Sequence, residues 1–280
     1  MPLHLCSLNS GSNANCYYIG TPEEAVLVDT GLSLRETERR MKQRGLEMEK
    51  IKAIFISHEH SDHITGMSGI SRKYRIPVYI TPATFAGSRM PLDEELKKNF
   101  RHGKAVTIGE LRVMPFKKSH DAADPHSFLI SAGGITVGVI TDIGYACKRV
   151  LKYFSQCHAV FLESNYCEEM LLNGSYPWPL KKRIHGDEGH LSNRQALELF
   201  QHYRSPELEL LILSHLSKNN NTPETVANLF APHAAGVNIV IASRYEAGEI
   251  FTLENKEVTK EIMKTKKKGL KNENQLTLFQ

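Results

Sequence analysis

The stretch of sequence that decides the fold reads His58-Glu59-His60-Ser61-Asp62-His63. The largely apolar run Ile51 to Ile56 precedes it and predicts a buried strand that ends at Ser57 and holds this loop rigidly. Imidazole nitrogens and carboxylate oxygens are ligands that zinc, iron and manganese accept. Because one ion would not need donors packed this tightly, the spacing favours two adjacent ions, with His58 and His60 on one and Asp62 and His63 on the other. The alternative is a polar surface turn that happens to be rich in histidine.

A site for two ions needs further donors, and the ends of other predicted strands supply them. Four apolar runs that are typical of strands each stop at an acidic or histidine side chain. In chain order these residues are Asp29, His120, Asp142 and His215. Each one alone is more often a capping or hydrogen-bonding residue, but their common position after strands strengthens all four as candidates.

The order of these residues resembles the metallo-β-lactamase fold, from about Met1 to Glu254. The resemblance implies an α/β fold (α+β in some schemes), a four-layer αββα sandwich of two mixed β-sheets with helices outside. It also implies two divalent metal ions per chain, one held by His58, His60 and His120 and the other by Asp62, His63 and His215. Asp142 would bridge the ions, Asp29 would fix the ligand loop by hydrogen bonds, and Asp62 would also serve catalysis by positioning a metal.

Composition agrees with a soluble globular protein, since 41% of the 280 residues are hydrophobic and 24% are charged. No apolar run reaches the roughly 18 residues that cross a membrane, and the N-terminus lacks the pattern of a signal peptide. The five cysteines are scattered without a Cys-x-x-Cys pair, which favours a reducing cytoplasm. The only break in composition predicts a catalytic domain over 1–254 and a basic flexible tail over 255–280.

Apolar periodicity and turn residues predict the order of elements. Strands are expected near 3–8, 15–20, 24–29, 52–57, 77–81, 208–214, 237–243 and 248–253, with paired strands within 105–140. Gly133-Gly134 would form a two-residue hairpin turn there. Helices are expected near 33–45, 67–74, 145–155 and 192–203 and from Thr222 onward, with Ser33 and Thr222 as N-caps.

Two bridged cations favour hydrolysis of an anionic ester such as a phosphodiester, although the same chemistry serves lactams and thioesters. Three segments resemble later motifs of nucleolytic members of the fold, including the transfer-RNA 3′-processing enzymes. They are Phe161-Leu162-Glu163-Ser164-Asn165-Tyr166, Gly189-His190-Leu191-Ser192-Asn193-Arg194 and Leu213-Ser214-His215-Leu216-Ser217-Lys218. The resemblance implies that Glu163 orients His190 and that His190 protonates the leaving alkoxide. The alternative for His190 is a cap at the start of a helix.

Only 47 residues separate Asp142 from His190, and they would hold a helix, the Glu163 strand and a turn. That leaves no room for the β-CASP domain of members that cleave messenger RNA. The three segments also resemble the YycJ/WalJ group of single-domain bacterial exonucleases. This resemblance implies a 5′-to-3′ DNA exonuclease linked to DNA repair, and to mismatch repair in particular.

The chain departs from that group between residues 10 and 15. The group reads Ser-Gly-Ser-Ser-Gly-Asn, whereas this chain has Ser10-Gly11-Ser12-Asn13-Ala14-Asn15. The hydroxyls and backbone N–H groups of this loop suit a terminal phosphate, and the alternative is an ordinary hairpin turn. Ser10, Ser12 and Lys218 are therefore the candidate phosphate or nucleic-acid contacts.

A net charge of +4 permits a nucleic-acid partner without requiring one. Three basic clusters lie beside ligand motifs, namely Lys117-Lys118, Lys181-Lys182-Arg183 and Lys218. They predict a track for the phosphate backbone. The alternative is that these lysines only keep the surface soluble.

The tail is rich in lysine and ends in Gln275-Leu276-Thr277-Leu278-Phe279-Gln280. Apolar residues at the tip of a polar tail predict a docking peptide. The pattern Gln-Leu-x-Leu-Phe resembles the peptide by which bacterial replication and repair proteins bind the β sliding clamp. Gln275 would donate or accept hydrogen bonds, while Leu276, Leu278 and Phe279 would supply apolar contacts. The alternative is an end that packs on its own domain.

The leading hypothesis is a cytoplasmic, binuclear metal-dependent DNA exonuclease tethered to replication. One alternative is another hydrolase of the same fold, acting on RNA or on a small ester or thioester. A second is a non-catalytic metal-binding regulatory protein, against which the intact ligand set and the pair of Glu163 and His190 argue. Histidine and carboxylate donors without cysteine suit zinc, with manganese as the alternative.

Overall fold

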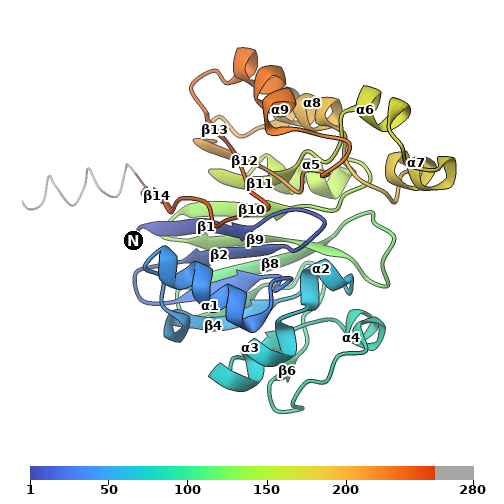
Figure 1. The fold of residues 1–280 in the computed structure, drawn as a ribbon. Coiled ribbons are helices and arrows are strands. Elements are labelled where there is room, and N and C mark those ends of the chain that lie inside the picture. The colour runs from blue at the N-terminus through green and yellow to red at the C-terminus, as the bar shows by residue number, and fades with distance from the viewer. Residues whose placement is uncertain (256–280) are drawn as a thin grey trace, which may run out of the picture.

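Two seven-stranded sheets stack face to face in the computed structural model, which describes residues 1–255 (Figure 1). The first sheet has the order β14-β1-β2-β3-β4-β5-β6. Its strands are β14 (Phe251–Leu253), β1 (Leu3–Asn9), β2 (Cys16–Gly20), β3 (Ala25–Val28), β4 (Ile51–Phe55), β5 (Val78–Tyr79) and β6 (Lys97–Lys98). Pairing is antiparallel from β14 to β3 and parallel from β3 to β6, so this sheet is mixed.

The second sheet has the order β13-β12-β11-β10-β9-β8-β7 and is also mixed. Its strands are β13 (Asn238–Ile241), β12 (Leu210–Ser214), β11 (Ala159–Glu163), β10 (Ile135–Ile140), β9 (His126–Ala132), β8 (Leu111–Lys117) and β7 (Val106–Ile108). Pairing is parallel from β13 to β10 and antiparallel from β10 to β7. The carboxyl ends of the parallel strands β10, β11 and β12 therefore lie along one edge.

Helices cover the two outer faces. Those packed on the first sheet are α1 (Leu34–Gln43) and α3 (Met67–Tyr74), and those packed on the second are α5 (Lys148–Phe154), α8 (Asn193–Tyr203) and α9 (Pro223–Phe230). The remaining α-helices of residues 1–255 lie towards the right-hand edge in Figure 1 and are α2 (Ser61–Ile64), α4 (Pro82–Ser88), α6 (Glu168–Asn173) and α7 (Trp178–His185). Short 3₁₀ helices span Met48–Lys50 and Ala231–His233.

The main core lies between the sheets. Fully buried side chains from both sheets, such as Phe55, Phe128 and Phe161, pack there, and separate apolar clusters lie under each helical layer. Burying these side chains is the main force that holds the layers together. The predicted four-layer αββα sandwich is confirmed.

Local predictions agree with the structure at several points. Ser33 caps α1 by accepting a hydrogen bond from the Glu36 N–H, and Thr222 caps α9. Gly133 and Gly134 both have positive φ and join β9 to β10, as a two-residue hairpin turn requires. The structure adds α2, α4, α6 and α7, which were not predicted. The interval between Asp142 and His190 thus holds three helices rather than one. The predicted clamp peptide, with Gln275, Leu276, Leu278 and Phe279, lies outside the described residues.

Candidate metal centre

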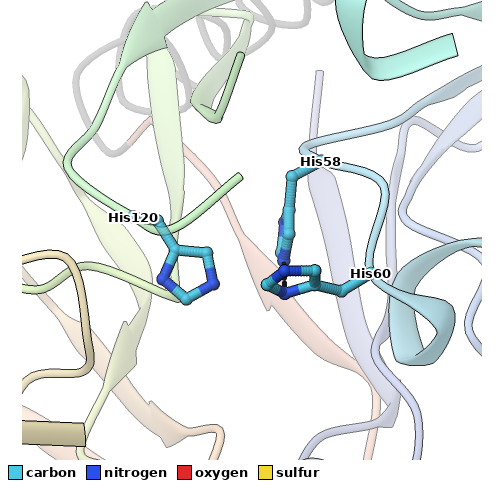
Figure 2. A group of neighbouring side chains, drawn as sticks. All are labelled: His58, His60 and His120. Carbon is cyan, nitrogen blue, oxygen red and sulfur yellow. Dashed lines mark hydrogen bonds between the residues drawn. The ribbon is translucent and has the colours of Figure 1, made fainter. Parts of the chain in front are cut away.

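Three of the predicted donors form a tight group at the edge of the sandwich. His58 and His60 come from the loop between β4 and α2, and His120 comes from the loop between β8 and β9 (Figure 2). The ring centroids lie 4.6 Å apart for His58 and His60 and 4.9 Å apart for His58 and His120. One nitrogen from each ring lies within 4.8 Å of the others. His58 is fully buried, so the alternative of a surface turn is wrong.

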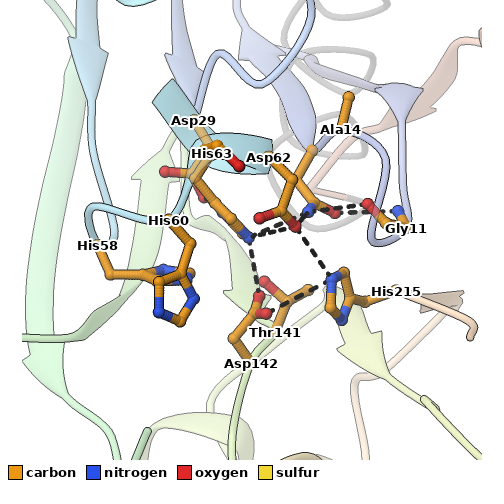
Figure 3. Close-up of polar contacts among 12 residues, drawn as sticks. Gly11, Ala14, Asp29, His58, His60, Asp62, His63, Thr141, Asp142 and His215 are labelled. Carbon is orange, nitrogen blue, oxygen red and sulfur yellow. Dashed lines mark hydrogen bonds and ion pairs between the residues drawn. The ribbon is translucent and has the colours of Figure 1, made fainter. Parts of the chain in front are cut away.

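A second group lies beside the first and consists of Asp62, His63 and His215 (Figure 3). Asp142 lies between the groups. Its carboxylate oxygens are 3.4 Å from His63 Nε2, 3.5 Å from His215 Nε2 and 3.9 Å from His120 Nε2. The structure therefore brings all seven predicted ligands together. The groups overlap, because His58, His63 and Asp142 also lie close enough to share an ion.

Each of four rings in the cluster is held through its Nδ1 atom. His63 Nδ1 lies 2.7 Å from an Asp29 carboxylate oxygen, and His215 Nδ1 lies 2.9 Å from Glu163 Oε1. His58 Nδ1 contacts the Ser57 hydroxyl, and His120 Nδ1 contacts a backbone carbonyl. These contacts turn the Nε2 atoms of the rings towards the cluster, which is how partners outside a ligand set orient imidazoles.

Asp29 is fully buried and has two further partners. The backbone N–H and the hydroxyl of Ser57 both donate to its carboxylate at 2.8 Å. Beside it, Gly31 approaches the backbone carbonyl of Asp62 so closely that a Cβ atom would collide with it. Asp29 therefore lies where the sequence predicted, fixing the loop that carries the donors.

Glu163 and His190 also meet. Glu163 is the last residue of β11, and its Oε1 atom lies 2.8 Å from Nδ1 of His190. The other oxygen accepts hydrogen bonds from the backbone N–H groups of Ile143 and Leu191. The His190 side chain remains 20% exposed, and its Nε2 atom is free of the contact with Glu163, which is made through Nδ1. The cap of α8 is Ser192 rather than His190, which removes the alternative reading of His190.

The two groups of donors differ in how they hold protons. Burial lowers the pKa of His58 well below its ordinary value, and the neighbouring His63 adds to that shift. Burial is also the main cause that lowers the pKa of His120 to about 4, against the opposing effect of Asp142. Both rings are therefore neutral near pH 7, with a lone pair ready for a cation.

In the second group, the pKa values of the two histidines are raised instead. Burial opposes a charged His215 ring, but the Asp142 carboxylate and hydrogen bonds with Asp62 and Glu163 raise its pKa to about 10. Burial likewise opposes a charged His63, yet the surrounding carboxylates raise its pKa well above the ordinary value. Protons on these rings would balance the buried carboxylates, which is a role that a bound cation would take over.

The donor set fits divalent metal ions. Three atoms that face the cluster, His120 Nε2, His215 Nε2 and Asp142 Oδ2, are buried without a partner in good hydrogen-bond geometry, and their contacts with neighbouring charged groups are 3.4 Å or longer. Buried polar atoms without partners are rare in folded proteins, and an ion is one of the explanations they call for. Imidazoles and carboxylates gathered around such atoms are the ligands of zinc and related transition metals.

The sequence did not point to some supporting residues. The Asn15 amide donates to Asp62 at 3.0 Å, and the Asn165 amide donates to the backbone carbonyl of His215 at 2.8 Å. Both asparagines lie inside the segments compared with the YycJ/WalJ group. Their buried amides hold a donor in place, and burial of an amide is not visible in a sequence.

The predicted phosphate track loses Lys118, and two of its other basic groups have partners within the protein. Lys118 is buried, and its ammonium group donates to the Thr141 carbonyl at 2.7 Å. Lys117 pairs with Asp124 at 2.9 Å, and Arg183 pairs with Asp121. These groups are occupied by the protein itself and hold the loops around the site.

The three candidate phosphate contacts lie near one another but differ in character. The Ser10 hydroxyl is buried and accepts a hydrogen bond from the His215 N–H at 2.8 Å. Ser12 and Lys218 are exposed. Ser10 and Lys218 line a cavity of about 210 Å³ next to His215, to which Arg244 also contributes. Ser10 therefore supports the metal centre as well as the wall of this cavity.

Comparison with known proteins identifies the family. The model of the beta-lactamase superfamily domain matches residues 24–216, which is more than half of the chain. The chain belongs to the β-lactamase superfamily. Its membership confirms the predicted class of metal-dependent hydrolase.

Two relatives in this superfamily extend over most of the chain. Exodeoxyribonuclease YycJ of Bacillus anthracis is 38% identical over 229 residues, covering 80% of this chain and 86% of the relative. Exodeoxyribonuclease WalJ of Streptococcus pneumoniae is 33% identical over 241 residues, covering 83% of this chain and 90% of the relative. The predicted resemblance to the YycJ/WalJ group is confirmed.

Solved structures support the fold. The metallo-β-lactamase fold protein YhfI of Bacillus subtilis has a TM-score of 0.70 at 17% identity and covers 90% of this chain and 99% of that protein. The short form of human tRNase Z has a TM-score of 0.62 at 14% identity, covering 88% and 98%. No helix within residues 1–255 is long and apolar enough to cross a membrane.

Proposed function

We propose that this protein is a binuclear metal-dependent phosphodiesterase that degrades DNA from the 5′ end, in repair or replication. The observation that carries the proposal is the buried carboxylate of Glu163 holding His190 at 2.8 Å beside the donor cluster. The two relatives that extend over most of the chain are both named exodeoxyribonucleases. Mismatch repair is the pathway to which the resemblance with their group points.

The roles of the donors follow the two groups. His58, His60 and His120 would hold one cation, and Asp62, His63 and His215 the other, with Asp142 reaching both. Two divalent cations held there would supply Lewis acidity and neutralise the charge of the phosphodiester. Zinc suits this cysteine-free donor set, and manganese is the alternative.

The protein's own contribution to catalysis is a proton at a defined place. A phosphodiester needs an acid because an unprotonated alkoxide leaves poorly. Glu163 holds His190 through Nδ1, so the Nε2–H would face the leaving oxygen. A thiolate leaves readily without a proton, so a thioester hydrolase does not need this donor, which favours the nuclease over that alternative.

Digestion from the 5′ end requires a place for the terminal phosphate. The 210 Å³ cavity beside His215 has Lys218 and Arg244 in its wall and would accept an anion. Arg244 is held there because its guanidinium donates to the Leu216 carbonyl at 3.1 Å. Ser12 would reach the same anion from the loop between β1 and β2.

Digestion of end-labelled single- and double-stranded DNA and RNA, with zinc and manganese compared, tests the proposal. We expect loss of DNA from the 5′ end, without sequence preference because backbone contacts position a strand but do not read bases. Release of label from RNA alone would favour the RNA nuclease, and hydrolysis of neither polymer would refute the proposal.

We further propose that the C-terminal peptide with Gln275, Leu276, Leu278 and Phe279 tethers the enzyme to the β sliding clamp. The pattern of the peptide and its place after a lysine-rich stretch support this. The five cysteines, free in the structure, support a cytoplasmic location.

A further inference from the structure

A second cavity lies between α6 and α7, with a volume of about 420 Å³. Leu171, Leu172 and Trp178 form its apolar part, and Lys181, Lys182 and His185 contribute basic groups. Its volume falls in the range of roughly 300–1,000 Å³ that is usual for ligand pockets. Both helices lie towards the same edge of the sandwich as α2, which carries Asp62 and His63 (Figure 1).

The apolar part of this cavity is unusually exposed. Trp178 is 67% exposed and Leu172 is 63% exposed, and α7 has no buried residue. An exposed tryptophan gains nothing from the core, so packing does not explain its presence. A neighbouring pair of large exposed apolar groups is typical of a binding site.

The cavity is held firmly against the metal centre. The Ile184 carbonyl, in the last turn of α7, accepts a hydrogen bond from the His190 N–H at 2.9 Å. Arg183 on the same helix pairs with Asp121, the residue after His120. Any group bound at Trp178 would therefore have a fixed position relative to the proton donor.

The charges around the cavity favour an anionic ligand with an apolar face. Lys182 is exposed and forms no ion pair with any residue from 1 to 255, and Lys181 donates to the Leu172 carbonyl at 2.6 Å. The one acidic lining residue, Glu168, accepts a hydrogen bond from the Ser192 hydroxyl. Aromatic rings flanked by lysines are the usual platform for single-stranded nucleic acid, because bases stack on the ring and phosphates meet the ammonium groups.

We propose that this cavity binds an unpaired base of the strand whose terminal linkage lies in the metal centre, with Trp178 stacked on the base and Lys182 beside the adjacent phosphate. The inference rests on the proposed nuclease function and adds that the substrate is single-stranded next to the cut. A protein partner fits less well. An ordinary protein interface covers about 800 Å² on each side, whereas only Leu172 and Trp178 among the described residues are large exposed hydrophobics here.

Fluorescence tests the stacking directly, because Trp178 is the chain's one tryptophan. The full-length, metal-loaded protein is titrated with a phosphorothioate oligothymidylate of about ten nucleotides, a length within the site sizes of such grooves. We expect saturable quenching of the tryptophan. An abasic strand of the same length keeps the charge but lacks the bases, and we expect it to quench little.

Variants test the energetics by anisotropy of a labelled strand. Trp178→Ala is expected to raise the Kd about 5- to 150-fold, the usual effect of losing one stacked base, whereas Trp178→Phe retains most of the affinity. Tyr203→Ala removes another exposed aromatic ring, on α8, and should leave the Kd unchanged. Lys182→Gln should lower the slope of log Kd against log salt by about one.

The outcomes separate this inference from the function on which it rests. If DNA is digested and bound but neither fluorescence nor Kd depends on Trp178, the stacking site is wrong and the nuclease stands. If no nucleic acid is bound or digested, both are wrong. If a peptide of Lys271 to Gln280 quenches Trp178 and the oligonucleotide does not, the cavity receives a protein segment and the inference is overturned.

Discussion

Asp142 lies at the centre of the donor cluster. Its buried carboxylate lies within 4 Å of four imidazoles, those of His63, His120, His190 and His215. Burial opposes its charge, but His215 and His63 hold its pKa well below the ordinary range. A carboxylate that stays ionised at the centre of the cluster is suited to join two cations, and its neighbour Asp62 is suited to hold one of them.

Asp62→Ala and Asp142→Ala should each abolish nuclease activity while the protein remains folded, because each removes a proposed metal contact. Elemental analysis should find close to two metal ions per chain in the wild type and fewer in each variant. Asp93→Ala is the control, since this carboxylate pairs with Arg75 on the surface. Absence of metal from the wild type after supplementation with zinc or manganese would rule out the binuclear centre.

His190→Ala should lower the rate of DNA cleavage about 10²–10⁴-fold, the usual cost of a lost proton donor, without loss of metal. A nitrophenyl phosphodiester, whose leaving group needs no protonation, should be cleaved almost as fast by the variant. Rates on both substrates are compared in one metal-loaded preparation. Equal losses would show that His190 binds metal or supports the fold instead.

Metal affinity should fall as the pH is lowered, because the raised pKa of His215, about 10, means that a cation must displace its proton. Each proton released changes the affinity about tenfold per pH unit. Competition with a chromogenic chelator between roughly pH 6 and 9 measures this dependence. An affinity that is flat over this range would contradict the protonated state of the second group.

The raised pKa of His215 makes the stability of the metal-free protein depend on pH in the opposite direction from its metal affinity. A raised pKa means that the ring binds its proton more tightly in the folded chain than in the unfolded one. The stability contributed by His215 is therefore complete below pH 6.5, its ordinary pKa, and is lost as the pH rises towards 10. Urea unfolding of chelator-treated protein at several pH values follows this loss.

Among the elements, the ends of strands carry most of the site. Asp29 follows β3, Asp142 lies just beyond β10, and His215 follows β12, and all three have positive φ angles between 54° and 59°. This conformation costs roughly 1–3 kcal/mol for residues other than glycine. A strand that would continue straight is turned at these residues, so the side chain faces the cluster.

One buried guanidinium connects helix α1 to the first sheet. Arg40 donates to the Leu8 carbonyl and the Asn9 side chain in β1, and to the Tyr245 carbonyl. Arg40→Met should destabilise the protein by about 2–4 kcal/mol, because it leaves several buried acceptors without a donor. Arg39→Met is the matched control, since Arg39 is half-exposed and, within residues 1–255, pairs only with Glu36.

Urea unfolding of both variants tests this difference. The exposed pair of Arg39 should contribute less than about 1 kcal/mol. Losses of equal size in the two variants would show that Arg40 does not anchor α1.

The sequence predicted strongly patterned elements well and weakly patterned ones poorly. The strands that end at donors are continuous apolar runs, and the caps at Ser33 and Thr222 are local signals. Thr81 and Pro82 start α4 with the same pattern as Thr222 and Pro223, but α4 is short and was missed. Helices α6 and α7 bury few side chains, so they leave little apolar periodicity.

The donor residues of the site could be predicted from the sequence, but the residues that hold the donors in place could not. Histidine and aspartate at strand ends are visible as residue types at fixed spacing. The roles of Asn15 and Asn165 depend on which loops meet in space, and the loss of Lys118 from the phosphate track depends on burial. These are tertiary properties that no local pattern encodes.

At the scale of the whole molecule, the centre is built from both sheets. Donors on the first sheet's side come from the segment 58–63, and those on the second sheet's side are His120, Asp142 and His215. Removing metal should therefore loosen the contact between the sheets more than either sheet itself. Hydrogen exchange with and without chelator measures this.

The tail should act independently of the centre. A peptide of Lys271 to Gln280 is expected to bind the sliding clamp with roughly micromolar Kd, because few side chains are anchored and an extended segment must be ordered. Replacing Leu278 and Phe279 by Ala should remove binding and leave digestion of short free DNA unchanged. Equal co-purification of the wild type and the double variant with the clamp would refute the tether. A lower Tm of the variant would instead show that the end packs on its own domain.

The division of the donors between two sheets also determines when a newly made chain becomes active. Strands β1 to β6 leave the ribosome before β7 to β13, since synthesis runs from the N-terminus. A chain interrupted after β6 has the donors of the segment 58–63 but none from the second sheet. Only when His215 has emerged are the donors of both proposed ion sites present, and β14, made last, then pairs with β1 at the edge of the first sheet. Chains truncated before His215 should therefore lack the proposed nuclease activity and leave the nucleic acid around them intact.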